Sequence, residues 1–321
     1  MKYSSTPRLI NTLVFAVLAA GFGFLAVYFG FLVAPYLWKE IGVTAIEIPV
    51  ISYGLAAMLS SVGFAGLILS IIGLVNSILS FMKRDDKYVL NGFNCYFALG
   101  YVLAVALILN ASWLLPLTTS NFSGDVSMPF VAIVYVIGAV LVMVGTNIPL
   151  VKLYENDESG KTMGKILLLA SIVIGVSIFI TFAISLLFVL IYGAGKVGQI
   201  NLIVKFLVYG LIPLLGACVA FFGLRASRKD DESKLPATLL YASLGIQSLG
   251  ILAAGIFMCA YNTDEKLSLV SQTKNGSFGA LDNWAGYAGL SFAVGGVILL
   301  GAIALIVITY LPKKEKKESV Y

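Results

Sequence analysis

Eight long apolar segments dominate this sequence, and short clusters of polar and charged residues separate them. A helix rises about 1.5 Å per residue, so about 20 apolar residues cross the hydrocarbon core of a bilayer, which is about 30 Å thick. Every one of the eight segments reaches that length, and the pattern therefore predicts an all-α integral membrane protein with about eight transmembrane helices. The segments comprise residues 11–36, 52–81, 92–115, 129–151, 165–192, 201–224, 237–261 and 285–311.

The composition indicates that lipid, and not water, is the solvent of this chain. Of its 321 residues, 60% are hydrophobic and 12% are charged, and the mean hydropathy is +0.98. Soluble domains are about 45–50% apolar and about 25% charged. The two longest predicted outer loops, residues 39–51 and 262–284, are too short to hold a soluble domain. We therefore expect residues 1–321 to form a single polytopic domain in the lipid bilayer.

The positive charges predict how the chain is oriented. Sixteen of the 21 lysines and arginines fall on the side that holds both termini, and basic loops are retained in the cytoplasm. Trp38, Trp113 and Trp284 all fall at the opposite ends of the predicted helices, where indole rings favour the membrane interface. We expect both termini in the cytoplasm and the plasma membrane as the location. Topology thus explains the net charge of +5, and nucleic-acid binding is not expected.

The charged inner turns recur at intervals close to one helical hairpin. Lys83, Lys152 and Arg225 mark three of these turns and lie 69 and 73 residues apart. This spacing is compatible with two four-helix halves built of hairpins, residues 1–155 and 156–321. Equal hairpins that obey the positive-inside rule would show the same spacing, so a true duplication stays open.

The sequence offers little for catalysis or for proton coupling. It has no histidine, and no Asp or Glu occurs within the eight apolar segments. General acid–base catalysis and proton pathways through membranes usually depend on these groups. Cys95, Cys218 and Cys259 lack the spacing of a metal or disulfide motif and are interpreted as packing residues. We expect no enzyme activity, no catalytic residues, no cofactor and no metal.

One glycine-rich stretch, Gly193-Ala-Gly195-Lys-Val-Gly198, is similar to a dinucleotide-binding turn. Such a site needs an acidic residue about 20 positions later for the ribose, and no Asp or Glu lies between Glu158 and Asp230. We interpret the stretch as a connecting turn. An enzyme that binds nicotinamide or flavin there is the weaker alternative.

Three residues inside the apolar segments are candidates for a functional role. Gln247, near the middle of its segment, is expected to form an interhelical hydrogen bond or to contact a substrate. Lys205, about four residues inside its segment, is expected to extend to the outer interface or to be a buried functional charge. Pro213 removes a backbone donor and is predicted to bend its helix.

The sequence favours a scaffold or accessory subunit of a membrane assembly. Its 32 glycines suggest close helix contacts, including contacts with other membrane proteins or with a second copy of the chain. The alternative is a passive channel or carrier for neutral or lipid-like small solutes. In that case Gln247 and the Pro213 kink would line a path between the two halves.

Overall fold

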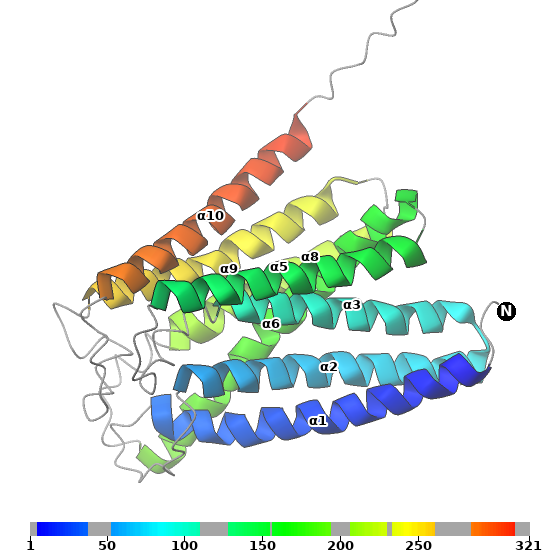
Figure 1. Ribbon diagram of the computed structural model, residues 1–321, viewed down its shortest axis with the longest axis horizontal. Helices are drawn as coiled ribbons and strands as arrows, with labels where there is room; N and C mark the ends of the chain where they lie inside the picture. The colour runs from blue at the N-terminus through cyan, green and yellow to red at the C-terminus, as the bar shows by residue number, and fades with distance from the viewer. Residues whose placement is uncertain are drawn as a thin grey trace, which may run out of the picture.

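A computed structural model describes residues 5–37, 53–109, 128–154, 156–193, 206–229, 233–260 and 284–311. Almost all of these residues are helical, and no strand occurs in them. The helices run back and forth along one direction (Figure 1). Their bounds are α1 (Ser5–Leu37), α2 (Tyr53–Lys83), α3 (Asp86–Leu109), α5 (Met128–Leu153), α6 (Asn156–Gly193), η4 (Leu207–Leu211), α8 (Ile212–Lys229), α9 (Leu235–Ala260) and α10 (Trp284–Tyr310).

The predicted fold class is confirmed, because the described part of every predicted apolar segment is helical. Seven of these helices are long and apolar enough to cross a membrane: α1, α2, α3, α5, α6, α9 and α10. The remaining segment folds as η4 and α8. α8 is 18 residues long and carries Arg225, Arg228 and Lys229 in its last turns, which lowers its hydropathy. The chain is an all-α multi-pass membrane protein.

Helix α6 crosses the bundle obliquely and holds its two sides together (Figure 1). It contacts α1, α2 and α3 on one side and η4, α8 and α9 on the other. In the most apolar part of its membrane span 61% of the residues are buried, which is the largest share among the seven spans. Because α6 packs against both groups of helices, residues 1–155 and 156–321 do not pack as separate bodies at this helix. The duplication itself stays a prediction.

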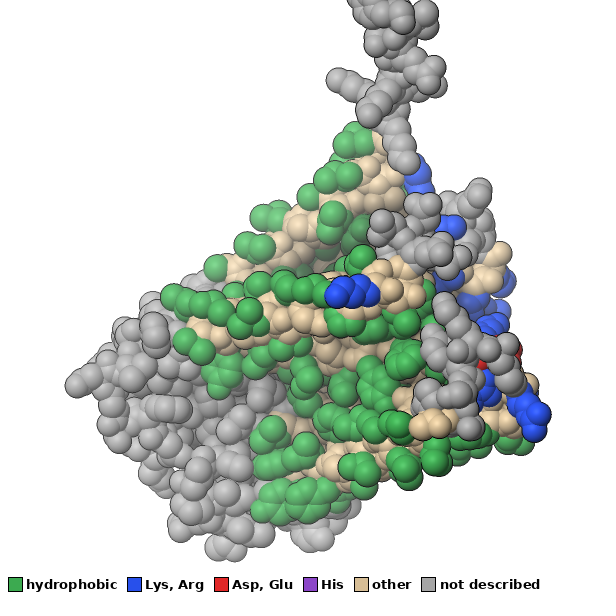
Figure 2. All heavy atoms as spheres, turned by 45° about the vertical axis from the view of Figure 1, so that its right-hand side comes forward, with side chains coloured by type: hydrophobic (Ala, Val, Ile, Leu, Met, Phe, Trp, Pro, Cys, Tyr) green, Lys and Arg blue, Asp and Glu red, His purple; other side chains and the backbone are tan. Residues whose placement is uncertain are grey.

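The outside of the bundle is apolar along its flanks and basic at one end. Hydrophobic side chains cover the flank in Figure 2, and lysine and arginine side chains gather toward one end. We call this end, where α2 and α8 finish and α3 and α9 begin, the basic end. Large exposed side chains such as Val297, Leu300 and Ile308 on α10 would be unfavourable in water. In a bilayer these side chains contact lipid acyl chains, so the apolar surface needs no protein to cover it.

Candidate binding cavities

Gln247 lies on α9 and joins this helix to α6. Its side-chain Nε2 donates to the Ser171 carbonyl oxygen at 3.1 Å and to Ser171 Oγ at 3.0 Å. Ser171 Oγ lies 2.7 Å from Ser243 Oγ, and the Ser243 hydroxyl donates to the Gly216 carbonyl at 2.7 Å. Since each hydroxyl has a single proton, Ser171 accepts from Gln247 and donates to Ser243. This Ser–Gln network (Ser171, Ser243 and Gln247) runs in one direction and connects α6, α9 and α8.

Pro213 is buried at the start of α8, directly after an irregular turn. The preceding residues Leu207–Leu211 form a π-helical turn, in which the Ile212 N–H bonds to the Leu207 carbonyl. Single π turns in α-helices are frequent at functional sites and at kinks. The bend predicted at Pro213 stays a prediction, while the structure places a change of helical geometry immediately before this residue.

Pro213 also lies at a close approach of α8 and α6. A Cβ atom added to Gly175 of α6 would overlap the Pro213 carbonyl oxygen and would lie 2.8 Å from Ala217 Cβ. Only glycine, which has no side chain, permits this approach. The two helices therefore cross backbone to backbone beside the irregular turn.

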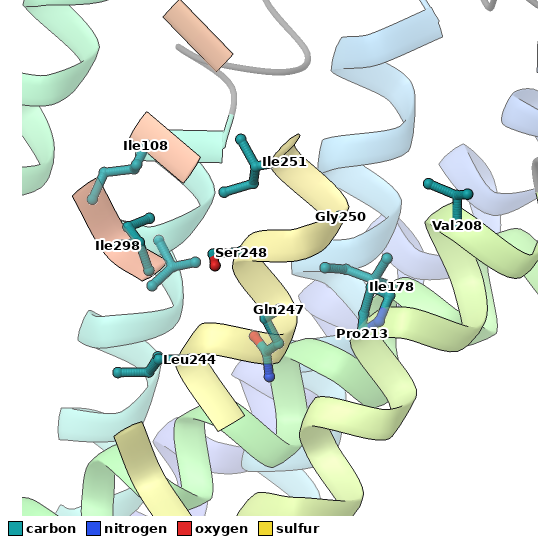
Figure 3. Close-up of a pocket in the computed structure, with 11 residues that line it drawn as sticks. Ile108, Ile178, Val208, Pro213, Leu244, Gln247, Ser248, Gly250, Ile251 and Ile298 are labelled. Atoms are coloured by element: carbon teal, nitrogen blue, oxygen red, sulfur yellow. The ribbon is translucent and has the colours of Figure 1, made fainter. Parts of the chain in front are cut away.

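A small cavity of about 100 Å³ adjoins Gln247. Side chains of α3, α6, η4, α8, α9 and α10 surround it, and Figure 3 shows Gln247 near Pro213 and Ile178. Its walls are mainly aliphatic, and Ser248 directs its hydroxyl to the Gly245 carbonyl of its own helix at 2.7 Å. This Gln247 cavity brings together two of the three predicted site residues. Its volume is below the about 300–1,000 Å³ of typical ligand pockets.

The third predicted residue, Lys205, lies outside the described residues. The glycine-rich stretch beyond Gly193 lies outside them as well.

A much larger cavity, of about 930 Å³, opens between α2, α3, α6 and α8 at the basic end. We call it the basic cavity. Its described lining carries four positive charges and no carboxylate, and it also carries three asparagines and an aliphatic part. The lining residues are Ile72, Asn76, Lys87, Asn91, Asn94, Cys95, Lys165, Ile166, Leu169, Leu224, Ser227, Arg228 and Lys229.

Hydrogen bonds fix the asparagine side chains of the basic cavity. The Tyr154 hydroxyl, at the end of α5, donates to Asn94 Oδ1 at 2.6 Å. Asn91 Nδ2 donates to Asn76 Oδ1 at 3.4 Å, and Asn76 Nδ2 donates to the Ile72 carbonyl at 2.8 Å. The sequence reasoning missed this cavity. Asn91 and Asn94, three residues apart on one helical face, are the signal that could have indicated a polar cavity there.

Packed side chains separate the two cavities. On α6, Leu169 lines the basic cavity and Ile178 lines the Gln247 cavity, so a helical rise of roughly 13 Å lies between them. Most of the α6 residues between them are buried, and several belong to one hydrophobic cluster with buried residues of α3. We call this group the plug; it comprises Ala98, Val102, Ala170, Val173 and Ile174.

The cysteines and acidic residues within the described ranges do not form a cluster. No group of three or more His, Cys, Asp or Glu residues that could hold a metal ion occurs in this part of the chain. Cys95 is buried and Cys218 is exposed, and both are free thiols. Cys95 Sγ donates to the Asn91 carbonyl at 3.4 Å, which accounts for its orientation within α3.

Comparison of the chain with protein-family models, with curated proteins and with solved structures finds no match. The two cavities and the plug are therefore the features from which a function can be inferred.

Proposed function

We propose that this protein is a non-enzymatic carrier for small lipid-like amphiphiles. The observation that supports the proposal is the position of the two cavities on opposite sides of the plug. A carrier that alternates between two open states has a half-path on each side of a closed segment, and that segment must be able to move. The sequence alone favours a scaffold, whereas the cavities favour the carrier.

The part that would move is the junction of η4 and α8. At this junction a π turn precedes Pro213, and Gly175 of α6 allows the α6 backbone to lie against the Pro213 carbonyl. Hinges absorb a change of backbone angles at a few residues near the end of an element. A small rotation here would shift Gly216, whose carbonyl accepts the Ser243 hydroxyl, and Ala217, which lies beside Gly175 of α6.

We further propose that the basic end faces the cytoplasm of the plasma membrane, because Lys and Arg are retained on that side. Solutes would enter from the cytoplasm through the basic cavity. Transport would be passive, since the eight apolar segments contain no carboxylate to carry a proton or a cation.

Accessibility of the plug tests the carrier. In a variant without native cysteines, Ala170→Cys replaces a plug residue that is 2% exposed. Methyl methanethiosulfonate, a small neutral thiol reagent, is then applied to membranes. A carrier that opens should label Ala170→Cys at a rate at least tenfold above that of Ala26→Cys, which is buried between α1 and α2. Equal, very slow labelling of both cysteines would indicate a static bundle.

The second candidate is the scaffold or accessory subunit, and one observation favours it. On α10, a Cβ added at Gly296 or Gly301 would meet no atom within 4 Å apart from its chain neighbours and the adjacent backbone of its own helix. Small residues at an open face allow another helix to approach closely, from a second copy or from another membrane protein. Native mass measurement of the protein purified in mild detergent tests this role. A monomer without a copurifying protein would contradict it.

A further inference from the structure

The basic cavity has two chemically different parts. Ile72 of α2, Leu169 of α6 and Leu224 of α8 supply aliphatic surface toward the bilayer interior. Toward the basic end, four cations come from three different helices. These cations are Lys87, Lys165, Arg228 and Lys229. A ligand that suits both parts carries a negative headgroup and an apolar chain.

We infer that the basic cavity binds an anionic lipid with a phosphate-bearing headgroup. Basic pockets between transmembrane helices on the cytoplasmic side hold such headgroups. Arginine and lysine form their strongest hydrogen bonds with phosphate and carboxylate oxygens. The volume of about 930 Å³ lies within the range of ligand sites, so it holds a headgroup and the first part of an acyl chain. The inference uses the cavity of the proposed carrier and does not require the plug to open.

The asparagines sharpen the preference for an oxygen-rich anion. Asn94 Oδ1 accepts the Tyr154 hydroxyl, which orients the side chain, and the Asn94 amide nitrogen is a donor. Ionised phosphate oxygens are only acceptors, so they suit this nitrogen and the cations of the lining. Asn91 and Asn76 are hydrogen-bonded to each other, which connects α2 and α3 at this wall of the cavity.

The apolar part distinguishes a lipid from a free phosphate ester. Ile72, Leu169 and Leu224 are half-buried, so they leave aliphatic surface in the cavity that a small polar ester would not cover. The acyl chains of a diacyl phosphate lipid can lie against this surface, and a soluble ester with the same headgroup has no chain to place there.

Native mass spectrometry of the full chain in a neutral detergent tests the site. Phosphatidylglycerol is titrated against phosphatidylcholine with the same acyl chains. The variant Lys165→Gln/Arg228→Gln removes two charges from the cavity, and Lys152→Gln/Arg225→Gln removes two exposed charges that do not line it. Lys165→Arg/Arg228→Lys keeps both charges and controls for misfolding.

We expect the wild-type chain to prefer phosphatidylglycerol over phosphatidylcholine by at least tenfold. Lys165→Gln/Arg228→Gln should lose at least tenfold in this affinity, whereas Lys152→Gln/Arg225→Gln and the charge-conserving variant should stay within threefold. Equal binding of both lipids, or an equal loss in both neutralised variants, would overturn the inference. Loss of binding in the charge-conserving variant as well would also overturn it.

A competition with glycerol 3-phosphate separates the two sources of the phosphate group. We expect millimolar glycerol 3-phosphate to leave the bound phosphatidylglycerol in place. Displacement would overturn the lipid assignment and would leave a site for soluble phosphate esters. Selective lipid binding without labelling of Ala170→Cys would support the lipid site and refute the carrier. Labelling of Ala170→Cys without selective lipid binding would support the carrier and refute the lipid site.

Discussion

Arg8 of α1 and Asp86 of α3 form a largely buried ion pair, with Arg8 Nη2 2.6 Å from Asp86 Oδ1. The side chain of Arg8 is 4% exposed and that of Asp86 is 24% exposed. Arg8 Nη1 also donates to the Ser80 carbonyl near the end of α2. One guanidinium group therefore connects α1, α2 and α3 at the basic end, even though these residues lie far apart in the sequence.

Removal of Arg8 should destabilise the basic end. Arg8→Met leaves the Asp86 carboxylate without this cation and the Ser80 carbonyl without this donor, so we expect a loss of about 2–3 kcal/mol, less than for a fully buried pair. Arg8→Met/Asp86→Asn should recover part of it, because the carboxylate that had faced Arg8 is then neutral as well. Denaturant unfolding in detergent measures both. Lys152→Met, on the exposed end of α5, is the control. An equal effect of Arg8→Met and Lys152→Met would refute the prediction.

The crossing of α6 and α8 should tolerate no side chain at Gly175. Gly175→Ala places a methyl group against the Pro213 carbonyl and 2.8 Å from Ala217 Cβ, so we expect a loss of about 1–3 kcal/mol from overpacking. Gly164→Ala lies on the same helix with nothing within 4 Å and should stabilise the protein by up to about 1 kcal/mol. Thermal unfolding of both variants in one detergent gives the comparison. The crossing would not be as close as described if both variants shifted the melting temperature alike.

The Ser–Gln network should show a measurable coupling between α6 and α9. In a double-mutant cycle of Ser171→Ala with Gln247→Leu, we expect a coupling free energy of about 0.6–1.7 kcal/mol. The control cycle pairs Ser171→Ala with Ser248→Ala, because the Ser248 hydroxyl bonds within its own helix. That cycle should give about zero. Identical coupling in the two cycles would mean that the interhelical bonds do not contribute.

Both ends of the described chain should lie on the same side of the membrane. Thr6 at the start of α1 and Leu311 after α10 are exposed, and the Thr238 hydroxyl lies 3.1 Å from Tyr310 Oη at the basic end. In a cysteine-free background, an impermeant maleimide should miss Thr6→Cys and Leu311→Cys in intact cells and label both once the cells are permeabilised. Labelling of only one terminus would contradict an even number of crossings, and labelling of both would reverse the orientation.

The apolar segments could be predicted from the sequence because hydropathy over about 20 residues is a strong local signal. Helix starts were predicted less well. α3 begins at Asp86 instead of residue 92, and α6 begins at Asn156 instead of residue 165. The first turns of these helices are polar, so they are helical but do not raise the hydropathy on which the prediction depended. At α3, Asp85 Oδ1 accepts the Lys87 N–H at 2.9 Å and thereby caps the new helix.

The cavities depend on long-range packing, which a single sequence does not reveal. Gln247 and Pro213 stood out because they are unusual in apolar segments, and both line the Gln247 cavity. The cations of the basic cavity did not stand out. Lys87, Lys165 and Arg228 come from three helices, and each looked like an ordinary inner-turn charge that sets topology.

The turn between α2 and α3 supplies a prediction in the stabilising direction. Arg84 has a φ of 50° and is exposed, so its backbone lies in the left-handed region that favours glycine. Arg84→Gly relieves this strain and loses some chain entropy, and we expect a net gain of about 0.5–1 kcal/mol in the free energy of unfolding. Arg84→Ala keeps the Cβ atom and should change stability by less than about 0.5 kcal/mol. Lys87→Gly, in the first turn of α3, should instead destabilise by up to about 1 kcal/mol. Unfolding in a single detergent ranks the three variants. A destabilised Arg84→Gly would show that residue 84 does not have a left-handed backbone conformation in the folded protein.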